Sequence, residues 1–358
     1  MPGPRVSSWP IAWGRARDVV AGPGAWLAAP DRAVTPRLLS NLQILRAFAA
    51  LNVVFYHVIV TSRLYGQPVD HMAFLQDWGQ SGVDLFFVIS GFVMVHVQAR
   101  APRSPAAFLA GRITRIAPVY WGLTLFVVAL YYLWPAVFRD MPMSWENVLT
   151  SLLFVSRWFG HEEPLIYLGW TLEYEMLFYA AFALGIASGD AALRLALVTL
   201  ILAGAVASGT VGPMAFEFVF GMVIGHLSIR WGRFPNATLL ALLGSIALGA
   251  SIFVETDWDR LLVWGVPAAL IVAAAAGARQ CAQPLLVLLG DASYSIYLVQ
   301  ILTIAAFYRA SPHLLSWVDY DLLALFCLVF TGAFGVVVHL CIERPITALV
   351  RTRTIFAS

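Results

Sequence analysis

An arginine and a histidine stand eleven positions apart in the first long apolar segment of this sequence, at Arg46 and His57. Ionisable side chains in such a segment are costly to bury, so each one marks a candidate functional site. On a helix, eleven residues make three turns plus about 20°, which places both side chains on one face, about 16 Å apart along the axis. A histidine there can act as a general base toward a hydroxyl group. The structural alternatives are a boundary arginine and a hydrogen-bonded core histidine.

Carboxylates recur in the apolar segments that follow. We expect Asp84, Glu175 and Glu217 to meet His57 in one polar cavity that leans toward the outer side, where a carboxylate would orient the imidazole. Glu173 lies two residues before Glu175, which is about 200° around a helix, so the two cannot both face one cavity squarely. Glu173 is therefore expected to be a structural hydrogen-bonding residue.

A pair of arginines, Arg112 and Arg115, precedes the third apolar segment. Their spacing makes them neighbours on a helix surface, and two forked guanidinium donors suit a phosphate group. Anchoring to lipid headgroups is an equally common role for such a pair. Farther along, Glu343 and Arg344 are expected to form an ion pair at a membrane boundary.

The elements that must position these residues are transmembrane helices. Apolar residues make up 60% of the 358 positions and charged residues only 12%, whereas a soluble domain carries about 25% charged residues. The sequence therefore predicts an all-α integral membrane protein, a polytopic bundle of about ten transmembrane helices. The expected spans are 42–62, 81–99, 117–137, 167–188, 191–209, 213–230, 237–254, 260–278, 284–308 and 321–343.

Arginine placement predicts the orientation of the bundle. With a cytoplasmic N-terminus, sixteen of the 22 arginines fall in inner segments and five in outer ones, so both termini are expected inside. We expect a flexible N-terminal tail over 1–40, a membrane domain over 41–346 and a C-terminal tail over 347–358. Residues 105–116 resemble a short interfacial helix, and 148–155 could form a re-entrant segment.

Composition also excludes several classes of function. A net charge of +2 is too small to indicate a nucleic-acid partner. The absence of lysine excludes Schiff-base chemistry, and the spacing of the three cysteines fits neither a metal site nor a disulfide framework. No secretory signal and no inverted repeat are visible.

Six segments together resemble the acyltransferase-3 family of integral membrane acyltransferases. In the family's order they are LQILRAFAALNVVFYHV with Arg46 and His57, GVDLFFVISGFVMV (82–95), FLAGRITRIAPVYW (108–121), GWTLEYEMLFY (169–179), GDASYSIYLVQ (290–300) and IERPI (342–346). The sequence around Glu175 looks most similar to that of the family branch that acetylates bacterial exopolysaccharides. Gln300 departs from the pattern, because many members have a histidine there.

The resemblance implies an O-acyltransferase that moves an acetyl group from cytoplasmic acetyl-CoA to a carbohydrate hydroxyl. Arg112 and Arg115, helped by Arg46, would hold the CoA phosphates, and the pantetheine arm would reach toward His57. His57 would deprotonate the acceptor or carry the acyl group, oriented by Glu175 or Asp84. The acceptor would contact Trp170, Tyr179 and Glu217, and no metal is expected.

The expected partners are the lipid bilayer, a carbohydrate acceptor and the machinery of polysaccharide synthesis and export, and the expected location is the inner (plasma) membrane. Two other classes stay open at this point. A proton-coupled transporter or flippase could use the buried ionisable residues as a relay. A non-catalytic subunit of an export machine could carry the same spans. Both alternatives predict that CoA does not bind.

Overall fold

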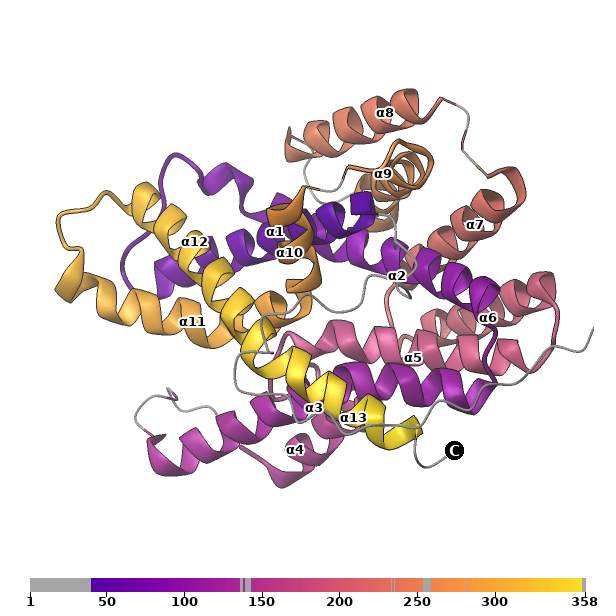
Figure 1. Cartoon of the computed structure of the whole chain (residues 1–358). Coiled ribbons are helices and arrows are strands. Elements are labelled where there is room, and N and C mark those ends of the chain that lie inside the picture. Colours follow the sequence, from indigo (N-terminus) through magenta and orange to yellow (C-terminus); the bar gives the residue numbers. More distant parts are fainter. Residues whose placement is uncertain are drawn as a thin grey trace, which may run out of the picture. The chain divides into compact units, whose positions relative to one another are not determined.

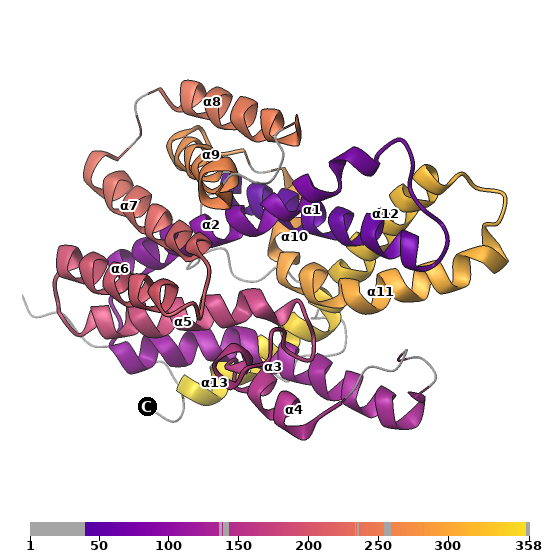
Figure 2. The ribbon, with the colours of Figure 1, turned by 180° about the vertical axis from the view of Figure 1, so that it is seen from behind.

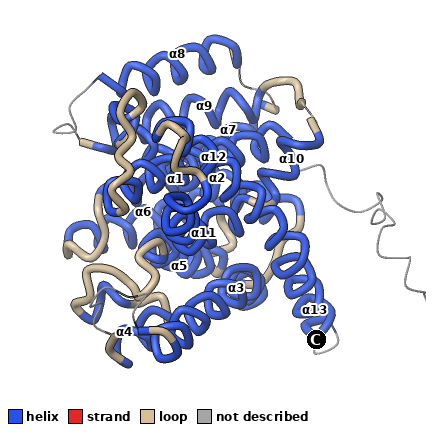
Figure 3. Tube along the Cα trace, turned by 90° about the vertical axis from the view of Figure 1, so that its left-hand side faces the viewer, coloured by secondary structure: helices blue, strands red, loops and turns tan. Residues whose placement is uncertain are grey.

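The computed structural model describes residues 40–135, 138, 143–232, 234, 236–253, 259–281 and 283–355. Within these ranges the regular elements are all helical, which confirms the expected fold class (Figure 3). The α-helices (Figure 1) are α1 (Ser40–Leu64), α2 (Ser81–Arg100), α3 (Pro105–Leu133), α4 (Trp145–Leu152), α5 (Gly169–Ile186), α6 (Ala191–Ala207), α7 (Phe216–Trp231), α8 (Ala237–Ala250), α9 (Val266–Gly277), α10 (Pro284–Asp291), α11 (Ser293–Leu314), α12 (Tyr320–Val338) and α13 (Arg344–Ile355). The expected N-terminal tail falls on residues that are not described, apart from its last residue.

Apolar length qualifies several of these helices as membrane spans. Four are long and apolar enough to cross a bilayer, namely 40–64, 73–100, 105–133 and 320–350, and the bent pair α10–α11 makes a fifth if it counts as one span. Three shorter apolar helices cover 191–207, 237–253 and 261–277. The total of about ten spans and the cytoplasmic placement of both termini stay predictions.

Three segments differ in their secondary structure from the simplest expectation. The interfacial helix at 105–116 is not separate, because α3 runs unbroken from its Ser104 cap through Pro118 to Leu133. The expected span at 284–308 is broken at Ala292, where α10 and α11 meet at 67°. The last span continues through a π-helical turn, η9 (His339–Glu343), into α13, so the expected C-terminal tail is helical as far as Ile355.

Close backbone contact joins α2 to α7. A β-carbon built on Gly91 would lie 2.0 Å from the carbonyl oxygen of Phe218, and one on Gly221 would lie 2.0 Å from that of Val88. Small residues at such positions let two helices pack backbone to backbone in a membrane. The helices α5 and α6 also run next to each other, and α6 contacts α7 (Figure 2). The position of α2 in the bundle is therefore fixed by its main chain.

The loop between α1 and α2 is fastened to the start of α12. The carboxylate of Asp321 accepts hydrogen bonds from the backbone N–H groups of His71 and Met72, at 3.2 and 3.0 Å. It also lies 3.1 Å from Nδ1 of His71, and this hydrogen bond, with the charge of Asp70, raises the pKa of the His71 imidazole. The loop is thereby anchored beside the C-terminal half of α1, which carries His57.

Candidate functional site

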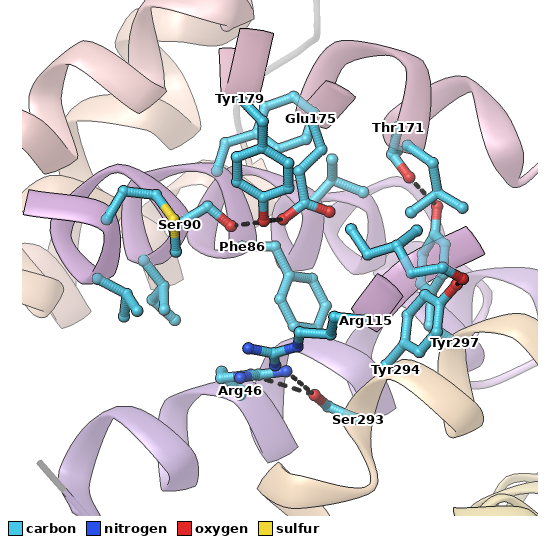
Figure 4. A pocket seen from close by; sticks show the side chains of 17 residues that line it. Arg46, Phe86, Ser90, Arg115, Thr171, Glu175, Tyr179, Ser293, Tyr294 and Tyr297 are labelled. Carbon is cyan, nitrogen blue, oxygen red and sulfur yellow. Dashed lines mark hydrogen bonds between the residues drawn. The ribbon is translucent and has the colours of Figure 1, made fainter. Parts of the chain in front are cut away.

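A cavity lies among α1, α2, α3, α5 and α11 and contains several of the residues singled out above (Figure 4). Its volume of about 90 Å3 exceeds the roughly 10–15 Å3 that one water molecule requires. Apolar side chains of α2 line one side. The polar lining residues are Arg46, Ser90, Arg115, Thr171, Glu175, Tyr179, Ser293, Tyr294 and Tyr297. The cavity therefore combines an apolar wall with a small number of placed polar groups, as ligand sites commonly do.

Two guanidinium groups, those of Arg46 and Arg115, face this cavity. Arg46 donates from Nε and Nη2 to the Ser293 hydroxyl, at 3.2 and 3.0 Å, and Arg115 lies beside it (Figure 4). In the part of the chain that the structure describes, neither arginine forms a salt bridge. The carboxylates of Glu175 and Glu343 interact electrostatically with these cations, but neither forms a salt bridge with them. This end of the cavity is suited to an anionic group with several oxygen acceptors.

The break between α10 and α11 positions the polar groups of this end. Ser293 is the first residue of α11, directly after the bend, and so reaches Arg46 on α1. The next residue, Tyr294, donates its hydroxyl proton to the Ile116 carbonyl oxygen of α3 at 2.7 Å. Ile116 follows Arg115, so this bond holds the first turn of α11 against the segment that carries the second arginine.

Glu175 is the carboxylate of the cavity. Its Oε1 accepts hydrogen bonds from Ser90 at 2.9 Å and from Tyr179, and among the described residues Oε2 has no hydrogen-bond partner. Glu173 points elsewhere, because its carboxylate accepts the backbone N–H groups of Ser156 at 2.8 Å and Arg157 at 3.4 Å. The expected division between a cavity-facing Glu175 and a structural Glu173 matches this geometry.

We expect Glu175→Gln to reduce activity more than Glu173→Gln. The first exchange changes the charge inside the cavity, whereas the second leaves one oxygen to cap the turn at 156–159 and costs about 1 kcal/mol of stability. Transfer rates and thermal unfolding of both variants in detergent would test this. A larger loss of activity in Glu173→Gln than in Glu175→Gln would show that the other face of α5 belongs to the site.

His57 is oriented by a tyrosine instead of the expected carboxylate. Its Nδ1 lies 3.0 Å from the Tyr167 hydroxyl, and the His57 ring packs edge-on against Tyr56 and Tyr167 with centroids 4.7 and 5.1 Å away. If Nδ1–H donates to the tyrosine oxygen, the lone pair of Nε2 is free to accept a proton. Sequence reasoning missed Tyr167, which lies in the irregular segment just before α5.

A pair of hydroxyl groups at the cavity wall is hydrogen-bonded to the residue that follows Tyr167 in the sequence. The hydroxyls of Tyr297 and Thr171 are 2.8 Å apart, and both can donate to the carbonyl oxygen of Leu168, at 3.0 and 3.1 Å. Leu168 directly follows Tyr167. His57 itself does not line the cavity. Its hydrogen-bonding partner Tyr167 is, however, the residue before Leu168, which binds both hydroxyls of the cavity wall.

Asp84 does not lie against His57, in contrast to the expected arrangement. Arg260 binds it with two hydrogen bonds, from Nε to Oδ1 at 3.1 Å and from Nη2 to Oδ2 at 2.8 Å. Such a two-pronged pair satisfies both carboxylate oxygens. Glu217 is fully buried near this pair, and neither of its oxygens accepts a hydrogen bond from the described residues. Both acids lie outside the cavity, so the expected single cavity of four groups separates into two sites.

We therefore expect Asp84→Asn to destabilise the protein by about 3 kcal/mol, because it leaves a largely buried guanidinium without its counter-charge. Glu217→Gln should change stability much less, since the amide has the same shape and its N–H can still donate to the neighbouring Asp84 carboxylate. The unfolding midpoint of each variant in detergent would measure the difference. Equal losses would contradict the assignment of Asp84 and Arg260 as a structural ion pair.

The remaining candidates divide between the cavity and its surroundings. Tyr179 lines the cavity, whereas Trp170 packs edge-on against Tyr174 at 5.5 Å and does not. Arg115 lines the cavity, but Arg112 lies over the Phe108 ring, 5.9 Å from its centroid.

The expected boundary ion pair between Glu343 and Arg344 is wrong, because Glu343 pairs with His339 at 2.8 Å and accepts the Ser295 hydroxyl proton at 2.6 Å. The π-helical turn η9 brings His339 and Glu343 together on one side of the helix, next to α11. No group of three or more His, Cys, Asp or Glu side chains within the described ranges could hold a metal ion.

Comparisons with known proteins identify the family of the chain. Residues 39–342 match the family model described as an acyltransferase domain, Acyl_transf_3. The chain is 33% identical over 301 residues to the exopolysaccharide production protein ExoZ of Rhizobium meliloti (strain 1021), which covers 78% of this chain and 93% of that protein. No solved structure matches the chain.

Proposed function

Because the chain belongs to the acyltransferase-3 family, we propose that it is an O-acetyltransferase of the inner (plasma) membrane that uses cytoplasmic acetyl-CoA. The proposed acceptor is a hydroxyl group of an exopolysaccharide or of its lipid-linked precursor. Similarity to an exopolysaccharide production protein supports this acceptor class. A polysaccharide synthesis and export machinery would then be the natural partner.

The observation that carries the proposal is the pair of cations, Arg46 and Arg115, which line the cavity and form no salt bridge with a described residue. Phosphate oxygens of CoA would be acceptors that match these forked guanidinium donors. The apolar wall of α2 suits the acyl and pantetheine portions of the same molecule.

In this proposal His57 accepts the proton of the acceptor hydroxyl at Nε2 while Nδ1–H stays bonded to Tyr167. The acceptor oxygen attacks the acyl carbon, the bond to sulfur breaks, and the proton passes to the departing thiolate. A route through an acyl-histidine would use the same nitrogen as the nucleophile. Glu175, held by Ser90 and Tyr179, would keep the donor end of the cavity ordered.

Two measurements test the function. Acetyl-CoA should raise the unfolding temperature of the detergent-solubilised wild-type protein, because a ligand that binds only the folded state stabilises it. Ester-linked acetate on cell-surface glycans should return to a deletion strain with the wild-type gene and not with empty vector. A folded protein that acetyl-CoA does not stabilise, together with unchanged acetate, would favour the transporter class instead.

A further inference from the structure

The proposed reaction needs a hydrogen-bond donor at the carbonyl oxygen of the acyl group. Acyl transfer builds negative charge on the carbonyl oxygen of the thioester, and donors aimed at that oxygen commonly give the largest single catalytic effect. Arg46 cannot serve if His57 is the base, because the two are about 16 Å apart along α1. A candidate donor lies in the part of the cavity wall that is bonded to Leu168, the residue after the tyrosine that contacts His57.

Two buried hydroxyls occupy that part of the cavity. Tyr297 on α11 and Thr171 on α5 both line it, and their side chains are bonded to each other (Figure 4). Both residues are almost fully buried, at 6% and 7% exposure. They share the Leu168 carbonyl as acceptor, one residue away from the tyrosine that contacts His57.

We propose that Tyr297 donates a hydrogen bond to the developing oxyanion of the acyl group, with Thr171 as the residue that positions it. This inference rests on the proposed acyl transfer. At rest the Leu168 carbonyl has two possible donors, so Tyr297 can turn its O–H toward the reacting oxygen while Thr171 still satisfies Leu168. The exchange replaces a neutral acceptor with a charged one, and hydrogen bonds to charged acceptors are roughly twice as strong.

The electrons and the proton balance without a further reactant. As the acceptor oxygen bonds to the acyl carbon, the carbonyl π electrons move onto its oxygen, where the Tyr297 O–H donates without losing its proton. Collapse of the oxyanion restores the carbonyl and expels the thiolate. The proton taken by His57 then goes to sulfur.

The test is Tyr297→Phe, which removes one hydroxyl and keeps the ring. Turnover at saturating acetyl-CoA should fall by about 10²–10³-fold, as for the loss of one oxyanion donor. Stabilisation of the protein by acetyl-CoA should be unchanged, because the donor phosphates bind at the arginine end. Thr171→Val should lower turnover less than Tyr297→Phe does. Thr171→Ser keeps the hydroxyl and should have a turnover close to that of the wild type.

A matched control lies on the same helix. Tyr308 is a buried tyrosine three turns farther along α11 and outside the cavity, so Tyr308→Phe should turn over at the wild-type rate. Wild-type turnover in Tyr297→Phe would overturn the inference, and so would a loss confined to acetyl-CoA stabilisation. If the wild type itself neither binds acetyl-CoA nor transfers acetate, the proposed function fails instead, which separates the two results.

Discussion

Replacing His57 with alanine is expected to abolish acetyl transfer while the protein stays inserted and folded. The imidazole is the ionisable side chain next to the inferred acyl position, and the loss of a general base typically costs 10²–10⁴-fold in rate. Because His57 is only partly buried and makes a single hydrogen bond, to Tyr167, its removal should cost little stability. Ester-linked acetate on surface glycans, normalised to the amount of protein in the membrane, measures the effect.

A second histidine provides the control for this variant. His226 lies on α7, and its Nδ1 contacts the Met222 carbonyl of its own helix at 2.8 Å, so His226→Ala should retain transfer. Tyr167→Phe should give an intermediate rate, because the imidazole keeps its place and loses its orienting partner. Transfer that survives His57→Ala at the wild-type level would remove this residue from the mechanism.

Removing the Arg115 guanidinium should weaken acetyl-CoA binding far more than removing that of Arg112. The sequence treats the two arginines as one pair, but only Arg115 lines the cavity beside Arg46. A charged hydrogen bond contributes about 1.5–3 kcal/mol, so we expect Arg115→Ala to raise the apparent KM for acetyl-CoA roughly 10–100-fold. Arg112→Ala, which loses a stacking contact with Phe108, should change it less than about threefold.

The measurement is the KM for acetyl-CoA together with turnover at saturation, in membranes that contain equal amounts of each variant. Turnover at saturating donor should stay near wild type in both, since the phosphates are remote from the reacting atoms. Equal KM changes in the two variants would indicate that both arginines have the same role, such as anchoring to lipid headgroups. An unchanged KM in Arg115→Ala would remove the phosphate site from the cavity.

The helical fold and part of the site follow from sequence patterns alone. Long apolar segments predict the helices, and the angle of 200° between Glu173 and Glu175 predicts that they face different surroundings. The spacing of Arg112 and Arg115 leaves them only about 60° apart on the helix, so it cannot decide which one faces the cavity. That choice depends on how α3 packs against α11, through contacts such as the Tyr294 bond to Ile116.

The partners of His57 and Asp84 lay beyond sequence reasoning for a different reason. Tyr167 and Arg260 are 110 and 176 positions away, respectively, and each lies near the start of an element, where helical periodicity carries little information. The break at Ala292 did have a signal in the sequence, because Gly290, Asp291 and Ser293 interrupt the apolar run there, but without a proline the segment is predicted as one span. Charge and apolarity predict which residues matter, whereas the tertiary contacts decide which ones meet.

The backbone contact between α2 and α7 has a consequence for donor chain length. The cavity wall on α2 consists of side chains such as Phe86, Phe87 and Met94, while Gly91 holds the helix against the Phe218 carbonyl. A longer acyl chain cannot gain room by pushing α2 outward, since no side chain stands between the two main chains to give way. If the proposed enzyme selects short over long acyl groups, that selection would therefore reside in the bulk of the wall residues, and a redesign for longer acyl donors would have to shorten those side chains.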